Sequence, residues 1–217
     1  MDLRIVPGVS WSANCYLLID EEQNKLLIID LGLDGRLTGY SLRKSLEELL
    51  GENSEDFEVE VFLTHSHIDH IAGENNLPPF KSLIFSASKI AAEHINSRDH
   101  VTLLQQFGGK ITFSVEKTYE DGATFSFAGN EFQVLHCPGH TDGSAVLFSP
   151  TMQALFSGDV VFKGSIGRMD LPTGNPEEMR QSLKRLLEYD IQHLYSGHGE
   201  ALHGNVKRNI QRALQLF

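Results

Sequence analysis

The sequence predicts a layered domain of the α/β or α+β class, in which β-sheets are covered by helices. Short β-type runs occur in pairs separated by turn residues, as is typical of hairpins. Segments with a single apolar stripe at helical spacing occur in both halves of the chain. No low-complexity linker, charge block or repeat of fixed period interrupts the 217 residues. We therefore expect one domain that spans residues 1–217.

The first part of the chain predicts a hairpin, a helix and a strand, in that order. Residues 15–20 and 25–30 are β-rich and flank the polar run EEQN. A leucine stripe at helical spacing follows, and Gly51 is placed to end this helix. The stripe consists of Leu42, Leu46, Leu49 and Leu50. Residues 58–64 then alternate as in a strand that buries one face. The residues predicted on that face are Val59, Val61 and Leu63.

The middle of the chain contains weaker signals, followed by two clear hairpins. Between residues 81 and 120, SLIF predicts a strand, SASKIAAEHI a helix, and the stretch around Leu103 a helical turn. Residues 123–136 predict two alternating strands around a Gly-Asn turn. Residues 144–159 predict a second antiparallel hairpin around Pro150.

Two amphipathic helices are predicted near the C-terminus. Asn175 is a suitable N-cap, Pro176 occupies the first helical position, and two glutamates follow in the first turn. The apolar stripe of this helix is Met179, Leu183, Leu186 and Leu187. The last helix presents Val206, Ile210, Leu214 and Phe217 on one face.

Composition excludes several classes of function. Subtracting 29 acidic from 18 basic residues gives a net charge of −11, which opposes binding to nucleic acid. No apolar run approaches the roughly 20 residues that span a bilayer, so no membrane contact is expected. The N-terminus lacks the apolar core of a signal peptide. Two cysteines, Cys15 and Cys137, form no disulfide framework and suit a cytoplasmic location.

The densest chemical signal is THSHIDH at residues 64–70, directly after the predicted strand 58–64. Residues two apart in extended chain share a face, so His65 and His67 can reach one point. Asp69 and His70, one turn further on, can reach a second point nearby. Two adjacent points with mixed nitrogen and oxygen ligands indicate a pair of metal ions rather than one structural zinc.

Three later segments each place a candidate ligand directly after a glycine. They are PGHTDG with His140, SGDVVF with Asp159, and SGHGE with His198. Glycine lets the backbone pass close to a crowded site. The candidates divide between two divalent ions if one carboxylate bridges them. Zinc is our first choice for the metal, with iron and manganese as alternatives, because all three accept imidazole and carboxylate ligands.

The other five of the ten histidines are interpreted as bystanders. They are His94, His100, His136, His193 and His203. A lone histidine in a loop is usually solvated or hydrogen-bonded, and we take this interpretation for four of them. His136, on the strand QVLH, could support a metal ligand, but an ordinary core or edge histidine is the preferred interpretation.

These motifs resemble the metallo-β-lactamase fold superfamily, whose hallmark is H-x-H-x-D-H at a strand exit followed by separated His, Asp and His ligands. PGHTDGS and the run FSGDVVFKGSIGRMDLPTGN are similar to the branch that contains hydroxyacylglutathione hydrolase (glyoxalase II) and persulfide dioxygenase. The resemblance spans nearly the whole chain. It implies a four-layer αβ/βα sandwich in which two mixed β-sheets are flanked by helices and the metals lie at one edge.

The resemblance also implies a role for each candidate. The first ion would be held by His65, His67 and His140, the second by Asp69, His70 and His198, and Asp159 would bridge them. Arg168 lies where glutathione-using relatives place a cation that meets the substrate carboxylate, although an ion pair with Asp170 is an equal alternative. Hydroxyacylglutathione hydrolases carry a C-terminal helical domain, and only 19 residues follow His198 here. Glutathione as the substrate is therefore not implied.

We expect an enzyme, a metallo-hydrolase that cleaves a small-molecule thioester of the hydroxyacylglutathione type. Two ions would supply a hydroxide at neutral pH and polarise the carbonyl. Asp69 would act catalytically by orienting the hydroxide or carrying a proton. A thiolate, with a pKa of about 8.5, leaves with little help, whereas an amine must be protonated. Lactam or lactone hydrolysis therefore ranks lower.

Two further hypotheses remain open at the level of sequence. A mononuclear iron dioxygenase acting on a persulfide would use His65, His140 and Asp159 as a two-histidine, one-carboxylate set. A metal-binding protein without turnover ranks low, because all seven candidate ligands are present. RNA-processing relatives share the motif, but the net charge of −11 opposes that function.

Overall fold

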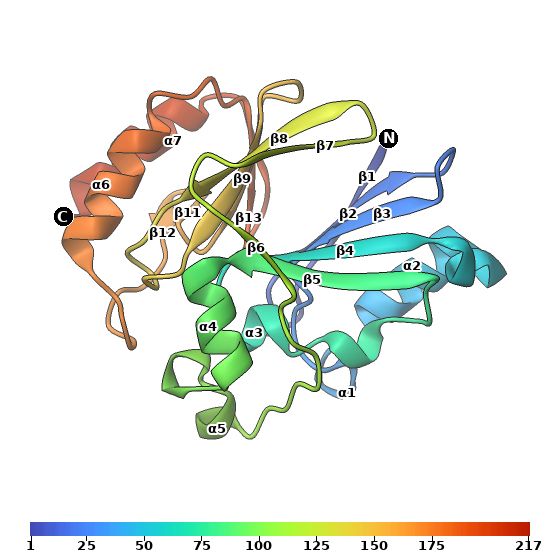
Figure 1. Cartoon of the computed structure of the whole chain (residues 1–217). Coiled ribbons are helices and arrows are strands. Elements are labelled where there is room, and N and C mark those ends of the chain that lie inside the picture. The colour runs from blue at the N-terminus through green and yellow to red at the C-terminus, as the bar shows by residue number, and fades with distance from the viewer.

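The computed structural model describes residues 1–217, apart from the side chain of Glu52. Two six-stranded sheets face each other and helices cover their outer sides, which confirms the predicted four-layer sandwich (Figure 1). The first sheet has the order β1 (Asp2–Val6), β2 (Cys15–Asp20), β3 (Lys25–Ile29), β4 (Glu58–Leu63), β5 (Ser82–Ser88) and β6 (Lys117–Tyr119). The second has the order β14 (Leu202–His203), β13 (His193–Ser196), β10 (Ala154–Gly158), β9 (Ala145–Ser149), β8 (Asn130–His136) and β7 (Thr124–Phe127).

Both sheets are mixed, as expected for this architecture. The strand pairs β1–β2 and β2–β3 are antiparallel, whereas β3, β4, β5 and β6 run parallel to one another. In the second sheet β7 to β10 are antiparallel, and β13 joins β10 in parallel. The carboxyl ends of β3, β4, β10 and β13 meet at one edge of the sandwich, because each parallel pair shares its direction (Figure 1).

Helices cover the outer face of each sheet. The longer helices are α2 (Ser41–Leu50) and α4 (Lys89–Ser97) on the first sheet, and α6 (Pro176–Leu186) and α7 (Val206–Ala213) on the second. The short ones are α1 (Gly35–Thr38), α3 (Ile68–Ile71) and α5 (Leu104–Phe107). The remaining elements are the strands β11 (Val161–Phe162) and β12 (Ser165–Ile166) and the 3₁₀ turns Gly51–Asp56, Glu74–Asn76, His100–Thr102 and Leu214–Leu216.

Alternation along the strands fills three apolar layers. In β2, Cys15, Leu17 and Ile19 pack under α2 and α4, whereas Tyr16 and Leu18 point between the sheets. The layer between the sheets is rich in aromatic rings, among them Phe62, Phe132 and Phe156. At about 25 cal/mol per Å² of apolar surface, this burial is the main source of stability. It also leaves little freedom where the strands end, so side chains there are held in place.

Most predicted elements are confirmed, with three corrections. The hairpin turn within 123–136 is Ala128-Gly129 rather than Gly-Asn, since Phe127 pairs with Asn130 and both turn residues have positive φ. Residues 86–88 continue β5, and the Ser88 hydroxyl caps α4, which shortens the predicted helix. The strand predicted to be half buried also buries Phe62 on its second face, because the opposite sheet covers it.

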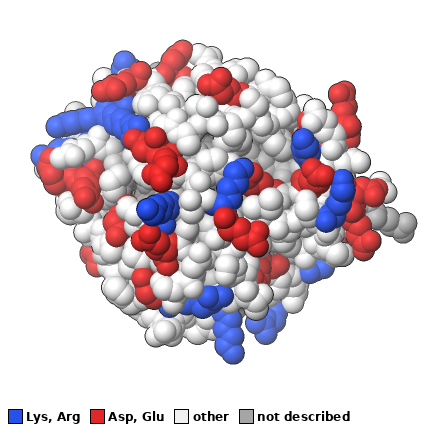
Figure 2. Space-filling view, viewed as in Figure 1, with Lys and Arg blue, Asp and Glu red and all other residues white. Residues whose placement is uncertain are grey.

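Surface charge and hydropathy give no sign of a nucleic-acid or membrane face. On the face shown in Figure 2, acidic and basic side chains are interspersed and no large basic patch forms. Among the described residues, no helix combines the length and the hydropathy that a bilayer crossing requires.

Candidate metal centre

The motif THSHIDH leaves the core at the end of β4 and folds at once into α3. His65 lies in the bend that follows β4, His67 is extended, and Asp69 and His70 lie on the single turn of α3. This change of period aims four side chains at one volume, as the spacing predicted. All three imidazoles of the motif are buried, and Asp69 is partly exposed.

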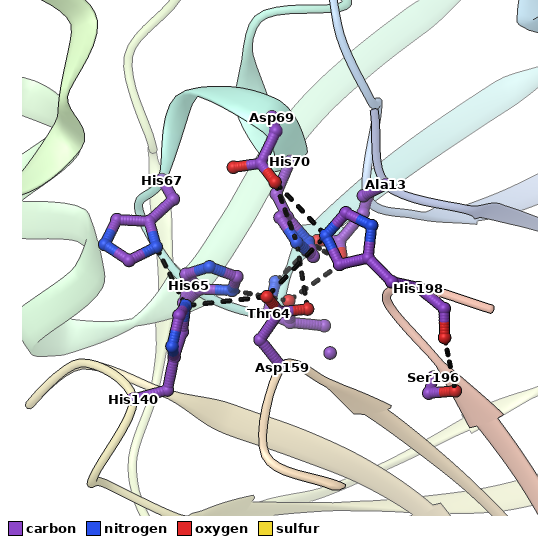
Figure 3. Close-up of polar contacts among 12 residues, drawn as sticks. Ala13, Thr64, His65, His67, Asp69, His70, His140, Asp159, Ser196 and His198 are labelled. Atoms are coloured by element: carbon purple, nitrogen blue, oxygen red, sulfur yellow. Dashed lines mark hydrogen bonds and ion pairs between the residues drawn. The ribbon is translucent and has the colours of Figure 1, made fainter. Parts of the chain in front are cut away.

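The three later segments bring their candidate ligands to the same volume. His140 follows β8, Asp159 follows β10, and His198 follows β13. Figure 3 shows His65, His67 and His140 on one side, Asp69, His70 and His198 on the other, and Asp159 between them. The ligand atoms form three overlapping groups in which all atoms lie within 4.8 Å of one another. These groups are His65–His67–His140, His65–His70–Asp159 and Asp69–His70–His198.

The cluster has two halves: His65, His67 and His140 form one, and Asp69, His70 and His198 form the other. Distances within each half, and from each half to Asp159, show how closely the ligands are packed. Nε2 of His140 lies 2.8 Å from Nδ1 of His67, and Nε2 of His198 lies 3.2 Å from Oδ2 of Asp69. Asp159 touches both halves: its Oδ2 is 3.6 Å from Nε2 of His140 and 3.6 Å from Nε2 of His198. Its Oδ1 is 3.2 Å from Nε2 of His70. A carboxylate in this position is suited to bridge two ions.

Two glycines next to the candidate ligands are required by close backbone contacts. Gly158 has φ +48°, and a Cβ there would lie 2.4 Å from Oγ1 of Thr64. A Cβ on Gly197 would lie 2.3 Å from Oδ1 of Asp159. No side chain fits at either position, since a contact below 3 Å forces the neighbour to move.

Outer partners fix the direction of three imidazoles. His70 Nδ1 lies 2.7 Å from Oδ2 of Asp30, and His140 Nδ1 lies 2.7 Å from the backbone oxygen of Arg168. The Thr64 hydroxyl donates to Asp30 at 2.8 Å, so it accepts at 3.2 Å from His65 Nδ1. Each ring therefore carries a proton on Nδ1, which leaves Nε2 as the inward atom that can bind a metal once it is unprotonated.

Asp30 is a functional candidate that the sequence interpretation missed. It follows β3, is almost completely buried, and accepts hydrogen bonds from both the amide and the hydroxyl of Thr64. Its backbone has φ +58°. The available signal was a carboxylate directly after the buried run KLLII, because a buried charge at a strand end needs partners.

The cluster passes a test for metal binding that depends on its own polar atoms. His65 Nε2 and His67 Nε2 are buried and have no hydrogen-bond partner, and the buried atoms His70 Nε2 and Asp159 Oδ1 contact only each other, at 3.2 Å. Several unpaired buried polar atoms in one place are costly, each by about 1–3 kcal/mol. A divalent cation would accept the lone pairs directed inward and remove most of this cost. The donor set, imidazole and carboxylate without thiolate, suits zinc, iron or manganese.

The protonation states of the histidines in the cluster also suit metal binding. Burial lowers the pKa of His65 well below its usual value, lowers that of His67 to about 3, and also lowers that of His140. These three rings are neutral and ready to bind a cation. Burial would lower the pKa of His70 as well, but the carboxylates of Asp30 and Asp159 raise it well above its usual value. His70 must therefore release a proton when a metal binds.

Arg168 lies beside the cluster, but its guanidinium points to a neighbouring carboxylate. Its Nε and a terminal nitrogen lie 2.6 and 2.7 Å from the two oxygens of Asp170, and its side chain is 62% exposed. The structure thus shows the ion pair that the sequence offered as the alternative. The backbone oxygen of Arg168 still contacts the cluster through His140.

The remaining histidines lie outside the cluster. His94 is held between Asp99 and Asp142 at 2.7 and 3.0 Å. The ring of His136 contacts the backbone oxygen of Tyr119, and His100 lies in a 3₁₀ turn. His193 and His203 pair with each other at 2.9 Å on the strands β13 and β14.

Comparisons with known proteins agree with the fold and the motifs. The family model described as the metallo-beta-lactamase superfamily matches residues 9–198. Hydroxyacylglutathione hydrolase GloC of Haemophilus influenzae is 30% identical over 195 residues, which cover 86% of this chain and 84% of that protein. Hydroxyacylglutathione hydrolase of Pectobacterium atrosepticum is 32% identical over 192 residues, covering 87% of this chain and 61% of that protein.

A solved structure matches over the full length. The protein TTHA1623, crystallised in a di-iron-bound form, superposes with a TM-score of 0.72 at 26% identity and covers 99% of this chain and 100% of that one. The matched residues of the family model include all seven candidate ligands. By motif, fold and sequence similarity, this chain is a member of the metallo-beta-lactamase superfamily.

Proposed function

We propose that this metal-dependent hydrolase cleaves thioesters, with two divalent ions held by His65, His67, His140, Asp69, His70 and His198 and bridged by Asp159. The observation that carries the proposal is the position of Asp159, whose carboxylate faces histidines of both halves at 3.2–3.6 Å. The hydroxyacylglutathione hydrolases among its relatives support the choice of a thioester. Zinc is our first choice of metal, with iron next because TTHA1623 holds two irons.

The bound ions would supply a hydroxide nucleophile at neutral pH and would polarise the substrate carbonyl. The chain itself positions the substrate and handles the proton. Asp69 is 17% exposed and its Oδ2 lies 3.2 Å from Nε2 of His198, so it can take up a proton next to the reacting carbonyl. The departing thiolate needs no protonated acid.

Exposure of the cluster defines the side from which substrate arrives. His198 is 30% exposed and Asp69 17%, whereas His65 and His70 are buried. A hollow beside His198 is lined by Phe162, Lys163 and Glu200 and has a volume of about 400 Å³. Substrate therefore approaches from the side of Asp69 and His198.

Arg168 is proposed to bind the carboxylate of a glutathione thioester. To meet a substrate carboxylate, its guanidinium must leave Asp170, with which it forms a solvent-exposed ion pair. An exposed ion pair of this kind is readily replaced by an ion pair between Arg168 and the substrate. If Arg168 binds substrate, R168A raises KM for glutathione thioesters and leaves KM for uncharged thioesters unchanged.

The location of the protein in the cytoplasm is also a proposal. Cys15 and Cys137 are free and buried, and burial raises the pKa of the Cys137 thiol to about 12. Unreactive, unpaired thiols of this kind are compatible with a reducing compartment.

One experiment tests the main proposal. Elemental analysis of the purified protein is combined with hydrolysis assays on glutathione, coenzyme A and simple alkyl thioesters. We expect two metal equivalents and thioester turnover that a chelator abolishes. One iron per chain, oxygen consumption with glutathione persulfide and tolerance of H198A would instead identify a mononuclear dioxygenase. Two metals with no turnover on any ester, thioester or lactone would support a binding protein.

A further inference from the structure

A cavity of about 610 Å³ is lined in part by Ile68 and Ala72, at the two ends of α3, the helix that carries Asp69 and His70. Residues of α1, α3 and α5 line it, and these short helices lie on the same side of the first sheet (Figure 1). Its apolar lining consists of Trp11, Leu33, Leu37, Ile68, Ala72 and Phe107. This volume falls in the range of small-molecule sites, about 300–1,000 Å³.

The walls of this cavity, which we call the α3 cavity, are tied to the metal centre. Trp11 belongs to the loop between β1 and β2, and two residues later the Ala13 amide donates to the backbone oxygen of Asp69 at 3.0 Å. The next amide, of Asn14, donates to the oxygen of Gly197 at 2.7 Å, directly before His198. The loop that carries Trp11 therefore joins the two segments whose ligands are the most exposed. Ile68, in the wall of the α3 cavity, directly precedes the partly exposed Asp69 in the chain, so the cavity adjoins the segment that carries this ligand.

The rim of the α3 cavity exposes large apolar side chains. Trp11 is 43% exposed, Phe107 55% and Leu37 65%. The ring centroids of Trp11 and Phe107 lie 5.4 Å apart, and the two tilted rings are in contact with each other. Exposed apolar groups that gather around one hollow, rather than scattering singly, indicate a binding surface.

The polar groups of the α3 cavity are mostly engaged with each other. Asp34 pairs with Arg36 at 2.7 Å, and Glu74 accepts hydrogen bonds from the amides of Thr112 and Phe113. Few free donors or acceptors remain to recognise a peptide-like thiol such as glutathione. Lys110 at the rim enters no ion pair with the described residues and leaves one cation for an anionic group. The lining therefore suits an apolar chain.

We propose that the α3 cavity binds the apolar acyl arm of the thioester, packed against the contacting rings of Trp11 and Phe107. This inference rests on the proposed function and adds the substrate class: thioesters of aliphatic or aromatic acids of medium length. The reacting carbonyl would lie at the metal centre and the arm would extend over Ile68 and Ala72. Burial of each methylene group strengthens binding by about threefold to fourfold.

Hydrolysis kinetics give the first test. Acetyl, hexanoyl and decanoyl thioesters of one thiol are compared in the metal-loaded enzyme. We expect kcat/KM to rise by about threefold per methylene until the arm fills the α3 cavity. In W11A and F107A this dependence should flatten, with at least tenfold loss for decanoyl and little loss for acetyl. L37A and L216A form a matched pair, because both leucines are well exposed and only Leu37 lines the α3 cavity.

Fluorescence gives a test that needs no turnover. Trp11 is the single tryptophan of the chain, so its emission reports on the α3 cavity alone. The metal-loaded protein is titrated with acetate, hexanoate and decanoate, which are the acids that hydrolysis would release. We expect the emission of Trp11 to shift to shorter wavelength with decanoate at far lower concentration than with acetate. F107A should weaken this response and L216A should not.

The outcomes separate the two proposals. Thioester hydrolysis that is independent of acyl length, with no response of Trp11, would overturn the inference and leave the proposed function standing. Binding that depends on chain length without any thioester hydrolysis would overturn the proposed function alone. Rates that depend on the thiol rather than on the acyl chain would also overturn the inference.

Discussion

The buried histidines at the metal centre and the surface pair His193 and His203 are each in close contact, yet their surroundings differ. The surface pair joins β13 to the edge strand β14, where the two Nδ1 atoms lie 2.9 Å apart and can satisfy each other as donor and acceptor. At the metal centre His65 directs inward an Nε2 atom that has no hydrogen-bond partner. Proximity alone therefore does not make a site: outer partners and burial do.

The outer partners explain the difference. Asp30, through His70 and Thr64, fixes which nitrogen of two rings carries the proton. The surface pair has no carboxylate in contact among the described residues, and water can replace either hydrogen bond. A cation gains much where lone pairs are already aligned and little where they are not.

The largest effect is expected from D159N. This substitution keeps the shape of the side chain and removes the charge that faces both halves of the cluster. We expect loss of at least one metal equivalent and a fall of about 10³-fold in kcat/KM, measured by elemental analysis and thioester assays. The control, the double variant H193Q/H203Q, should retain both metals and full activity. Equal effects in the two variants would contradict the comparison.

Removing the metal is expected to destabilise the protein substantially. At a metal concentration 100 times the Kd, binding contributes about 2.7 kcal/mol to the free energy of unfolding. For a chain of this length the Tm should fall by about 5–10 °C on chelation, followed by circular dichroism. H193Q/H203Q should show the same fall, because the surface pair contributes nothing to it. If chelation left Tm unchanged, the unpaired atoms of the cluster would not hold a cation.

D30N tests the role of the outer partner. The variant keeps a hydrogen-bond acceptor for His70 but removes the buried charge that raises the pKa of this ring. We expect metal affinity to fall by about 10–100-fold, measured by competition with a chelator. D20N is a matched control, because Asp20 is also buried and ends the neighbouring strand β2, where it caps a turn. Unchanged affinity in D30N would show that the ring orientation does not depend on this carboxylate.

The smallest effect is expected from H94Q. Burial lowers the pKa of His94, but Asp99 and Asp142 outweigh burial and raise it. Because the pKa of His94 is higher in the folded state, protonation of this ring stabilises the folded protein. The stabilisation is fully present below the unfolded-state pKa of about 6.5 and is lost as the pH rises through the folded-state pKa. H94Q should remove this pH dependence, at a cost below about 1 kcal/mol at pH 5 and less at pH 9. Equal destabilisation at both pH values would contradict the predicted direction of the pH dependence.

Much of the site could be predicted because its signals are local. THSHIDH packs four candidates into six residues, and each later candidate follows a glycine that the structure shows to be sterically required. Asp30 could not be found in this way, because its partners Thr64 and His70 are 34 and 40 residues away. The α3 cavity was missed for the same reason, since Trp11, Ile68 and Phe107 share no local pattern.

The sequence by itself determined the hairpins, the amphipathic helices and the candidate ligands, because apolar periodicity and spacing act over a few residues. Tertiary structure alone decided which strands lie parallel, which nitrogen of each ring faces inward, and that Asp159 lies between the two halves of the cluster. These features depend on contacts between segments far apart in the chain. They are set only when the two sheets pack together and bring their strand ends to one edge.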